Sequence, residues 1–156
     1  MSFSEINPKT KSKIKGLILE YKNIPQPGLL IPIPNPQLDV DYKITISSSE
    51  FTSLCPLATS QPDYATITIE YYPENLIVEL KSLKFYLVSY RTVEIFHEAV
   101  VGQILKDLAK ACNPRKMKVI GDFTIRGGVH TIIEASLSIR KVASSAPAAA
   151  IPSAKL

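Results

Sequence analysis

The chain has 156 residues, of which 46% are hydrophobic, and it carries a formal net charge of +4. This length predicts one domain with a sizeable core, and the modest positive charge permits an anionic ligand without requiring a nucleic-acid partner. No apolar run approaches the ~20 residues of a membrane-spanning helix, and two cysteines cannot form a disulfide framework. The start of the chain, residues 1–10, is polar and does not match a secretory signal, so we expect a cytoplasmic protein.

The first 38 residues differ in composition from those that follow. Lysines gather in residues 1–22, and residues 25–36 contain five prolines. Because proline fixes its own φ and cannot donate a hydrogen bond, this segment is expected to be extended and to form neither a helix nor a central strand. We predict a basic and proline-rich arm over residues 1–38, a folded domain over 39–140, and a disordered tail rich in Ala, Pro and Ser over 141–156.

Alternation of apolar and polar residues predicts the main strands of the folded domain. They cover residues 42–47, 65–72, 116–124 and 130–139. The last two are expected to form a hairpin, because Gly127-Gly128 lies between them. Residues 76–80 form a shorter predicted strand, which we expect to pair with its predecessor across a turn at residues 73–75.

The period changes to that of a helix between these two groups of strands. Ser82 can cap a helix that buries Leu83 and Leu87 on one face. A second helix is predicted to begin near Glu94 and to end at Asn113. Its apolar stripe comprises Val101, Ile104, Leu105, Leu108 and Cys112. The order of elements predicts an α+β fold, an antiparallel sheet with both helices on one face, whose open edges favour pairing with another chain.

Residues 51–66 contain the first candidate for chemistry. Cys55 and Asp63 lie on one segment, with Pro56 and Pro62 between them, so the loop is expected to have a fixed shape. A thiol and a carboxylate held together could act as a nucleophile beside a proton donor. The alternative is a buried structural cysteine and a turn-capping aspartate. The two histidines and two widely spaced cysteines match no metal-ligand spacing, so no metal is expected.

Two cationic positions could hold a phosphate. Lys81 and Lys84 lie one turn apart at a predicted helix start, where free backbone N–H groups and the helix dipole favour anions. Arg126 precedes Gly127 in the hairpin turn and could approach a phosphate closely. The alternative for all of them is an ordinary solvated surface charge.

The segment Phe96-His97-Glu98 could hold a ring with the donor edge of guanine. A carboxylate such as that of Glu98 can accept two hydrogen bonds from such an edge, and Phe96 could stack on the ring. Neighbouring helix residues point about 100° apart, so His97 and Glu98 could line two sides of one pocket. The alternative is a first-turn glutamate favoured by the dipole and a surface histidine.

Together these motifs resemble the NADPH-dependent 7-cyano-7-deazaguanine reductases, the nitrile reductases of queuosine biosynthesis, in their single-module form. The motifs are Phe-Thr-Ser-Leu-Cys-Pro from residue 51, Gln-Pro-Asp-Tyr-Ala-Thr from 61, Glu-Leu-Lys-Ser-Leu-Lys-Phe-Tyr from 79, Phe-His-Glu from 96, Gly-Asp-Phe-Thr from 121 and Arg-Gly-Gly from 126. The motif from residue 79 is the specific one, because it separates the reductases from relatives with the same fold.

The resemblance implies the tunnelling fold, in which such units assemble into homo-oligomeric rings, paired pentamers among them, with sites between subunits. It implies reduction of a nitrile to a primary amine by two NADPH through a thioimide on Cys55, with Asp63 protonating the nitrogen. Substrate contacts are implied for Glu79, Ser82, Phe96, His97 and Glu98. Contacts to NADPH are implied for Lys81, Lys84, Arg126 and Gly127.

The sequence departs from the family pattern at two places, and two other functions are alternatives to nitrile reduction. The loop between Cys55 and Asp63 is slightly longer than the family pattern, and Ile125 stands where proline is common. A tRNA-modifying amidinotransferase of the same fold would use the same thioimide but should lack the motif from residue 79. In a non-enzymatic purine- or pterin-binding ring protein, Cys55 and Asp63 would have no chemical role. We expect no membrane contact and no direct binding of nucleic acid.

Overall fold

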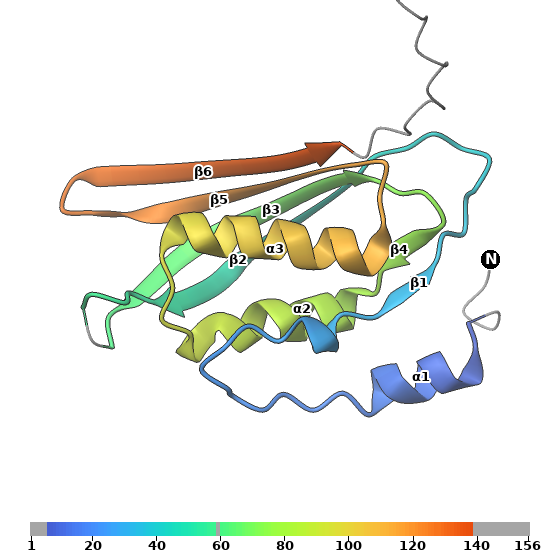
Figure 1. The fold of residues 1–156 in the computed structure, drawn as a ribbon, viewed down its shortest axis with the longest axis horizontal. Coiled ribbons are helices and arrows are strands. Elements are labelled where there is room, and N and C mark those ends of the chain that lie inside the picture. Colours follow the sequence, from blue (N-terminus) through green and yellow to red (C-terminus); the bar gives the residue numbers. More distant parts are fainter. Residues whose placement is uncertain (1–5, 59, 139–156) are drawn as a thin grey trace, which may run out of the picture.

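A computed structural model describes residues 6–58 and 60–138 of the chain. In order, it contains α1 (Pro8–Lys15), η2 (Pro27–Leu29), β1 (Pro32–Pro34), β2 (Ile44–Leu54), β3 (Pro62–Tyr72), β4 (Leu76–Val78), α2 (Leu80–Val88), η3 (Ser89–Thr92), α3 (His97–Cys112), β5 (Lys116–Arg126) and β6 (Val129–Ser138), where η denotes a 3₁₀ helix. Four long antiparallel strands form a sheet in the order β2-β3-β5-β6, as Figure 1 shows. The predicted α+β class with an antiparallel sheet is confirmed.

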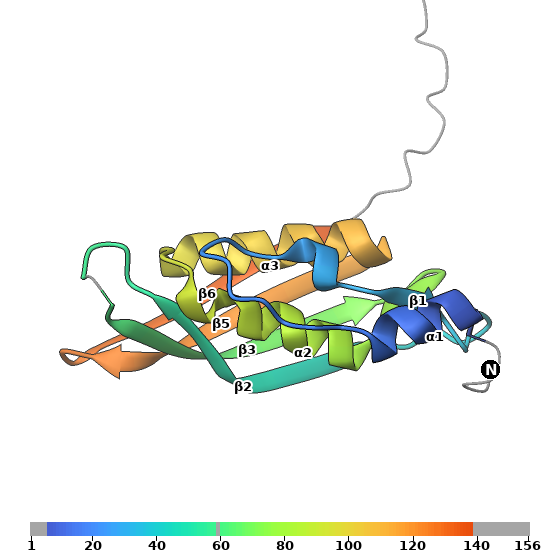
Figure 2. The same ribbon diagram turned by 90° about the horizontal axis from the view of Figure 1, so that it is seen from below.

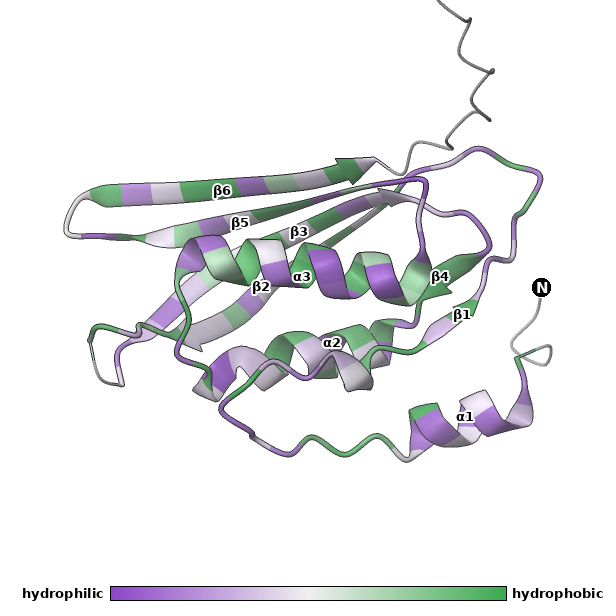
Figure 3. Ribbon diagram, in the orientation of Figure 1, coloured by the Kyte–Doolittle hydropathy of each residue, from purple (hydrophilic) through white to green (hydrophobic). Residues whose placement is uncertain are grey.

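The core lies between this sheet and the helices α2 and α3 (Figures 1 and 2). Along β3 every second residue is buried, which is the pattern of a strand with one face on a core. Figure 3 shows the corresponding alternation of hydrophobic and hydrophilic residues along β6. The buried residues of α3 include the predicted stripe, Val101, Ile104, Leu105, Leu108 and Cys112. The period of the sequence therefore decides which face of each element is buried.

The helix α3 packs closely against β5 at a glycine. A Cβ atom on Gly121 would lie 2.7 Å from Cγ2 of Val101 in α3 and 2.9 Å from Cε2 of Phe123 in β5. Both distances are shorter than a normal contact between carbon atoms. The absence of a side chain at residue 121 therefore sets the spacing between this helix and the sheet.

The hairpin between β5 and β6 has the predicted turn. Gly127 and Gly128 adopt φ values of 58° and 80°, and Arg126 pairs with Val129 across them. A two-residue hairpin turn with two positive φ values suits the right-handed twist of the strands, and glycine adopts it without a steric cost.

The predicted pairing of the short strand after Tyr72 is wrong. β4 pairs with β1 and not with β3, with Pro32 opposite Val78 and Pro34 opposite Leu76. Proline is tolerated here because the strand is short and lies at an edge. The first long strand also reaches further than predicted, to Leu54, because a bulge between Ser48 and Phe51 interrupts its alternation.

Both main helices begin at residues other than those predicted. The N-cap of α2 is Glu79 and not Ser82. α3 begins at His97, because the backbone before it pairs with the end of β2 and stays extended: Leu54 donates to the Val93 carbonyl and Ile95 donates to the Leu54 carbonyl.

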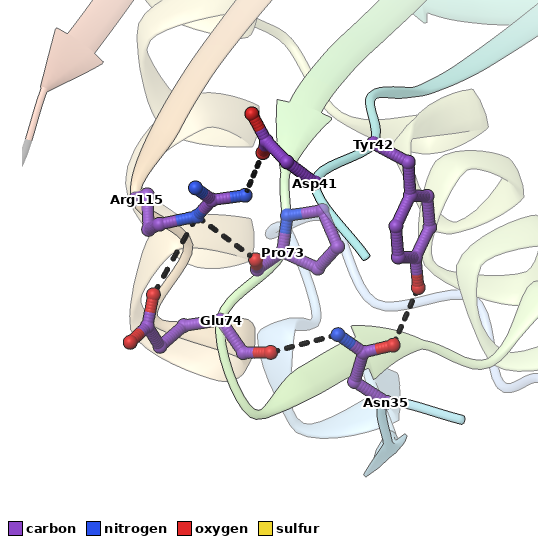
Figure 4. Close-up of polar contacts among 6 residues, drawn as sticks. All are labelled: Asn35, Asp41, Tyr42, Pro73, Glu74 and Arg115. Atoms are coloured by element: carbon purple, nitrogen blue, oxygen red, sulfur yellow. Dashed lines mark hydrogen bonds and ion pairs between the residues drawn. The ribbon is translucent and has the colours of Figure 1, made fainter. Parts of the chain in front are cut away.

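Ordered structure begins before Asp39. α1 contacts α2, since Lys81 Nζ donates to the Ile14 carbonyl at 2.9 Å, and Leu30 and Ile31 are buried. A polar network also ties the proline-rich segment to the β3–β4 turn (Figure 4). Its members are Asn35, Asp41, Tyr42, Pro73, Glu74 and Arg115. The predicted disordered tail, residues 141–156, lies outside the described residues.

A second polar network lies inside the core, between α2, η3 and α3. The Tyr86 hydroxyl donates to Asp107 at 2.6 Å and lies 2.9 Å from the Tyr90 hydroxyl, while Gln103 donates to the other oxygen of Asp107 at 2.8 Å. Burial raises the pKa of Tyr86, so this hydroxyl stays protonated and donates. The network satisfies a buried carboxylate and fixes the two helices relative to each other.

Candidate active site

Three segments that are distant in sequence meet at one end of the molecule. They are the loop after β2, the start of α3 and the β5–β6 hairpin, and Figures 1 and 2 show them together in both views. The loop is closed by its own backbone, because Cys55 donates to the Gln61 carbonyl and Gln61 donates to the Ala58 carbonyl, both at 2.9 Å. Cys55 therefore lies directly beyond the paired strands, at the start of this loop.

The two cysteines lie in different surroundings. Cys55 is a free, half-buried cysteine of the loop, whereas Cys112 is buried in the core. Burial raises the pKa of the Cys112 thiol to about 11, because the thiolate would lose its hydration. Of the two cysteines, Cys55 is therefore the more accessible, and Cys112 is a core residue as predicted.

Asp63 is a buried carboxylate held by two basic side chains. It is the second residue of β3, opposite Ser53 of β2, and its side chain is 4% exposed. One carboxylate oxygen lies 2.6 Å from Nη1 of Arg126, and the other lies 3.2 Å from Nε2 of His97. A carboxylate is rarely this buried unless it is paired, and both of its oxygens are satisfied by side chains that can carry charge.

The His97 ring is fixed by the sheet below it. It lies flat on the buried ring of Phe123, with the centroids 3.8 Å apart and the planes at 8°. As the first residue of α3, His97 directs Nε2 toward Asp63. The stacking and this contact together leave the imidazole one orientation. Phe96 is 53% exposed, and Glu98, in the first turn of α3, is exposed too.

The other predicted site residues lie at the start of α2. The carboxylate of Glu79 accepts from the backbone N–H groups of Lys81 at 2.9 Å and of Ser82 at 2.7 Å. The buried Ser82 hydroxyl donates to the Glu79 carbonyl and accepts from the N–H of Ile31. Two of the N–H groups expected to be free at this helix start therefore already donate to a carboxylate. Lys81 and Lys84 are exposed, and the ammonium group of Lys81 donates to the Ile14 carbonyl.

The structure does not bring the three predicted phosphate-binding cations together within one chain. α2 begins beside β4, at the end of the molecule opposite to the β5–β6 hairpin with Arg126 and Gly127 (Figure 1). Cys55, Asp63, His97 and Arg126 gather at the hairpin end. Glu79, Lys81, Ser82 and Lys84 gather at the other end.

Two residues at the hairpin end were not predicted from the sequence. Phe123 fixes His97, which required knowledge of the packing. Ser53 is fully buried opposite Asp63, and its hydroxyl has no hydrogen-bond partner within residues 6–58 and 60–138. The alternation that buries Phe51 extends to Ser53, and this signal could have identified it.

Two classes of feature are absent from the described part of the chain. No group of three or more His, Cys, Asp or Glu side chains there could hold a metal ion. None of the helices in residues 6–58 and 60–138 has the length and apolar character needed to cross a membrane.

The sequence matches a known family model and several curated proteins. The sequence profile of the QueF-like proteins matches residues 62–141. The NADPH-dependent 7-cyano-7-deazaguanine reductase of Thermomicrobium roseum is 56% identical over 66% of this chain and 80% of its own length. That of Trichodesmium erythraeum is 45% identical over 86% of this chain and 95% of its own length.

The fold of this chain also resembles that of a solved structure. The apo form of an archaeosine synthase QueF-Like superposes with a TM-score of 0.56 at 26% identity, covering 60% of this chain and 91% of that protein. The aligned reductases share about twice this identity. The chain belongs to the QueF-like family that includes the NADPH-dependent 7-cyano-7-deazaguanine reductases.

Proposed function

We propose that this protein reduces the nitrile of 7-cyano-7-deazaguanine to the aminomethyl group of 7-aminomethyl-7-deazaguanine, with NADPH, as a cytoplasmic step of queuosine biosynthesis. The observation that carries the proposal is the buried Asp63 between His97 and Arg126, beside the strand that leads into Cys55. The names of the aligned reductases support the substrate and the cofactor.

The first step is addition of the Cys55 thiol to the nitrile. A bond forms between sulfur and the nitrile carbon, one π bond of the C≡N group is lost, and the nitrogen takes up a proton, which gives a neutral thioimide. Asp63 and His97 form a pair of proton-handling groups beside this loop and can pass the proton. The C=N bond of the thioimide accepts hydride more readily than the nitrile does, so covalent attachment prepares the reduction.

The complete reduction takes four electrons, and NADPH supplies them as two hydrides. The residues at the start of α2 fit its phosphates by their chemistry, because the exposed Lys84 lies there beside Lys81, whose ammonium group can donate to a phosphate as well as to the Ile14 carbonyl. One hydride and one proton would convert the thioimide to a thiohemiaminal, whose carbon carries both sulfur and nitrogen at the oxidation level of an imine, and this adduct would expel the Cys55 sulfur. The imine that this leaves takes the second hydride.

A site that uses both ends of the chain needs two copies. Cys55 and Asp63 lie at one end and Lys84 at the other (Figure 1). The contact would therefore join two different surfaces of neighbouring copies. Repeated head-to-tail contacts of this kind form a closed ring when their rotations add up to a full turn. We accordingly include in the proposal a homo-oligomeric ring of the tunnelling fold. Glu98 and Phe96 then hold the deazaguanine from one subunit and Glu79 contacts it from the next, while the buried Ser82 supports Glu79 through its backbone N–H.

The test follows the absorbance of NADPH in the presence of free 7-cyano-7-deazaguanine. We expect oxidation with a stoichiometry of two NADPH per nitrile consumed. The resemblance to an archaeosine synthase favours one alternative, a transferase that forms the same adduct. An adduct on Cys55 without any oxidation of NADPH would support that alternative. Binding without an adduct would indicate a purine- or pterin-binding protein.

A further inference from the structure

The guanidinium of Arg126 is directed to the start of β3. Its Nη1 lies 2.6 Å from a carboxylate oxygen of Asp63, and its Nη2 donates to the Pro62 carbonyl at 2.6 Å. With the Gln61 amide oxygen turned toward it, Nη1 and Nε gain a further acceptor at 3.0 and 3.3 Å. Three consecutive residues of the catalytic loop and strand are therefore bound by one side chain.

The end of the strand ladder explains this position. The pairing between β3 and β5 stops at Ala65 opposite Phe123, and beyond it side chains replace the backbone partners. Thr124 donates through its hydroxyl to the Tyr64 carbonyl at 3.3 Å, and Arg126 donates to the Pro62 carbonyl. Among the described residues, the hydrogen bonds and ion pairs of the Asp63 carboxylate go to Arg126 and His97 alone. Arg126 therefore fixes one oxygen and turns the other toward His97.

We propose that Arg126 is a positioning residue for Asp63 in thioimide formation, before any contact with a cofactor. The proposal rests on the proposed function. A charge-assisted bond of 2.6 Å holds the carboxylate in the geometry that His97 and the nitrile nitrogen require. The resemblance assigned Arg126 to NADPH alone, and that assignment would leave adduct formation unchanged when Arg126 is replaced. The ion pair between Arg126 and Asp63 predicts instead that adduct formation slows when Arg126 is replaced.

The experiment measures the rate of adduct formation on Cys55 by intact mass, in rapid mixing with 7-cyano-7-deazaguanine and without NADPH. We expect Arg126→Ala to lower the maximal rate by about ten- to a hundredfold, part of the ~10²–10⁴ contributed by positioned proton transfer. The nitrile concentration at half-maximal rate should stay within about twofold, since Arg126 acts on Asp63 and not on substrate binding. Arg126→Lys, which keeps one cation, should recover most of the rate.

The matched control is Arg115→Ala, which removes an arginine paired with Asp41 at 2.5 Å at the other end of the sheet (Figure 4). This variant should form the adduct at the wild-type rate. Unchanged rates in Arg126→Ala, or a loss as large in Arg126→Lys, would overturn the proposal. If Arg126→Ala fails to fold, Arg126→Gln takes its place under the same criteria. A wild-type protein that forms no adduct would contradict the proposed function itself, which is a different result.

Discussion

Two carboxylates at opposite ends of the molecule are held in different ways. Glu79 accepts from two backbone N–H groups at the start of α2, whereas Asp63 accepts from the side chains of Arg126 and His97. Backbone donors stay in place as long as the helix exists. Side chains of Arg and His can change partner or protonation during a reaction. Under the proposed function, the carboxylate at the hairpin end is the one that takes part in the reaction, whereas the carboxylate of Glu79 caps a helix.

The largest effect is expected for Cys55→Ala, which removes the only accessible thiol identified at the hairpin end. It should form no covalent adduct with 7-cyano-7-deazaguanine and should show no NADPH oxidation above background. Cys112→Ala is the control, because a buried thiol with a pKa of about 11 is not a nucleophile near neutral pH. An adduct that persists in Cys55→Ala, or that maps to Cys112, would end the assignment.

Glu98→Ala should weaken substrate binding and leave NADPH binding near normal. If the exposed Glu98 takes the donor edge of the deazaguanine, its loss leaves those donors unpaired at a cost of roughly 1–3 kcal/mol. Calorimetry with the nitrile in the Cys55→Ala background measures this loss as about a 5- to 150-fold weaker Kd. Glu94→Ala, an exposed glutamate just before α3, is the matched control. Equal affinities in the two variants would leave Glu98 as a residue that only favours the helix dipole.

Lys84→Ala tests whether the start of α2 also serves the cofactor. If its ammonium group contacts the 2′-phosphate, the KM for NADPH should rise and the preference for NADPH over NADH should fall, about tenfold for each ~1.4 kcal/mol lost. Lys110→Ala, in the last turn of α3, removes the same charge elsewhere. Steady-state kinetics with NADPH and with NADH measure both the KM and the preference between the two cofactors. An unchanged preference in Lys84→Ala would make the start of α2 a structural cap and nothing more.

The smallest expected effects are changes in the free energy of unfolding at two buried serines, one at each end of the molecule. Ser82→Ala leaves the buried N–H of Ile31 without its acceptor and should lower the free energy of unfolding by roughly 1–3 kcal/mol. Ser53→Ala removes a buried hydroxyl that has no partner in the described residues, so it should leave the free energy of unfolding unchanged or raise it. Urea unfolding of both variants measures the difference. Equal losses would show that Ser53 is bonded in the folded protein.

The sequence predicted the elements whose signals are local. The alternation along β3, the apolar stripe of α3 and the Gly127-Gly128 turn each depend on residues a few positions apart. Cys55 and Asp63 were candidates for the same reason, since a short loop joins them. The specific motif from residue 79 identified the family, although the structure shows the first residue of that motif capping a helix.

The features that the sequence did not predict depend on distant partners. β4 pairs with β1, more than forty residues earlier, and no local pattern distinguishes this partner from β3. The contact between Arg126 and Asp63 depends on where the β3–β5 ladder stops, which is a property of the twisted sheet. The start of α3 was misplaced because a bridge to Leu54 keeps residues 93–95 extended against their helical pattern.

The glycine at residue 121 limits how this protein can vary. A methyl group there would press on Val101, one helical turn after His97, and on Phe123, which carries the His97 ring. The ring on which the imidazole stacks would be displaced by this substitution, even though Gly121 is not among the residues proposed to take part in the reaction. Inherited changes at this position are therefore expected to be eliminated as strictly as changes at Cys55. A mutational scan should find residue 121 intolerant of substitution because of packing, although Gly121 has no role in the proposed reaction.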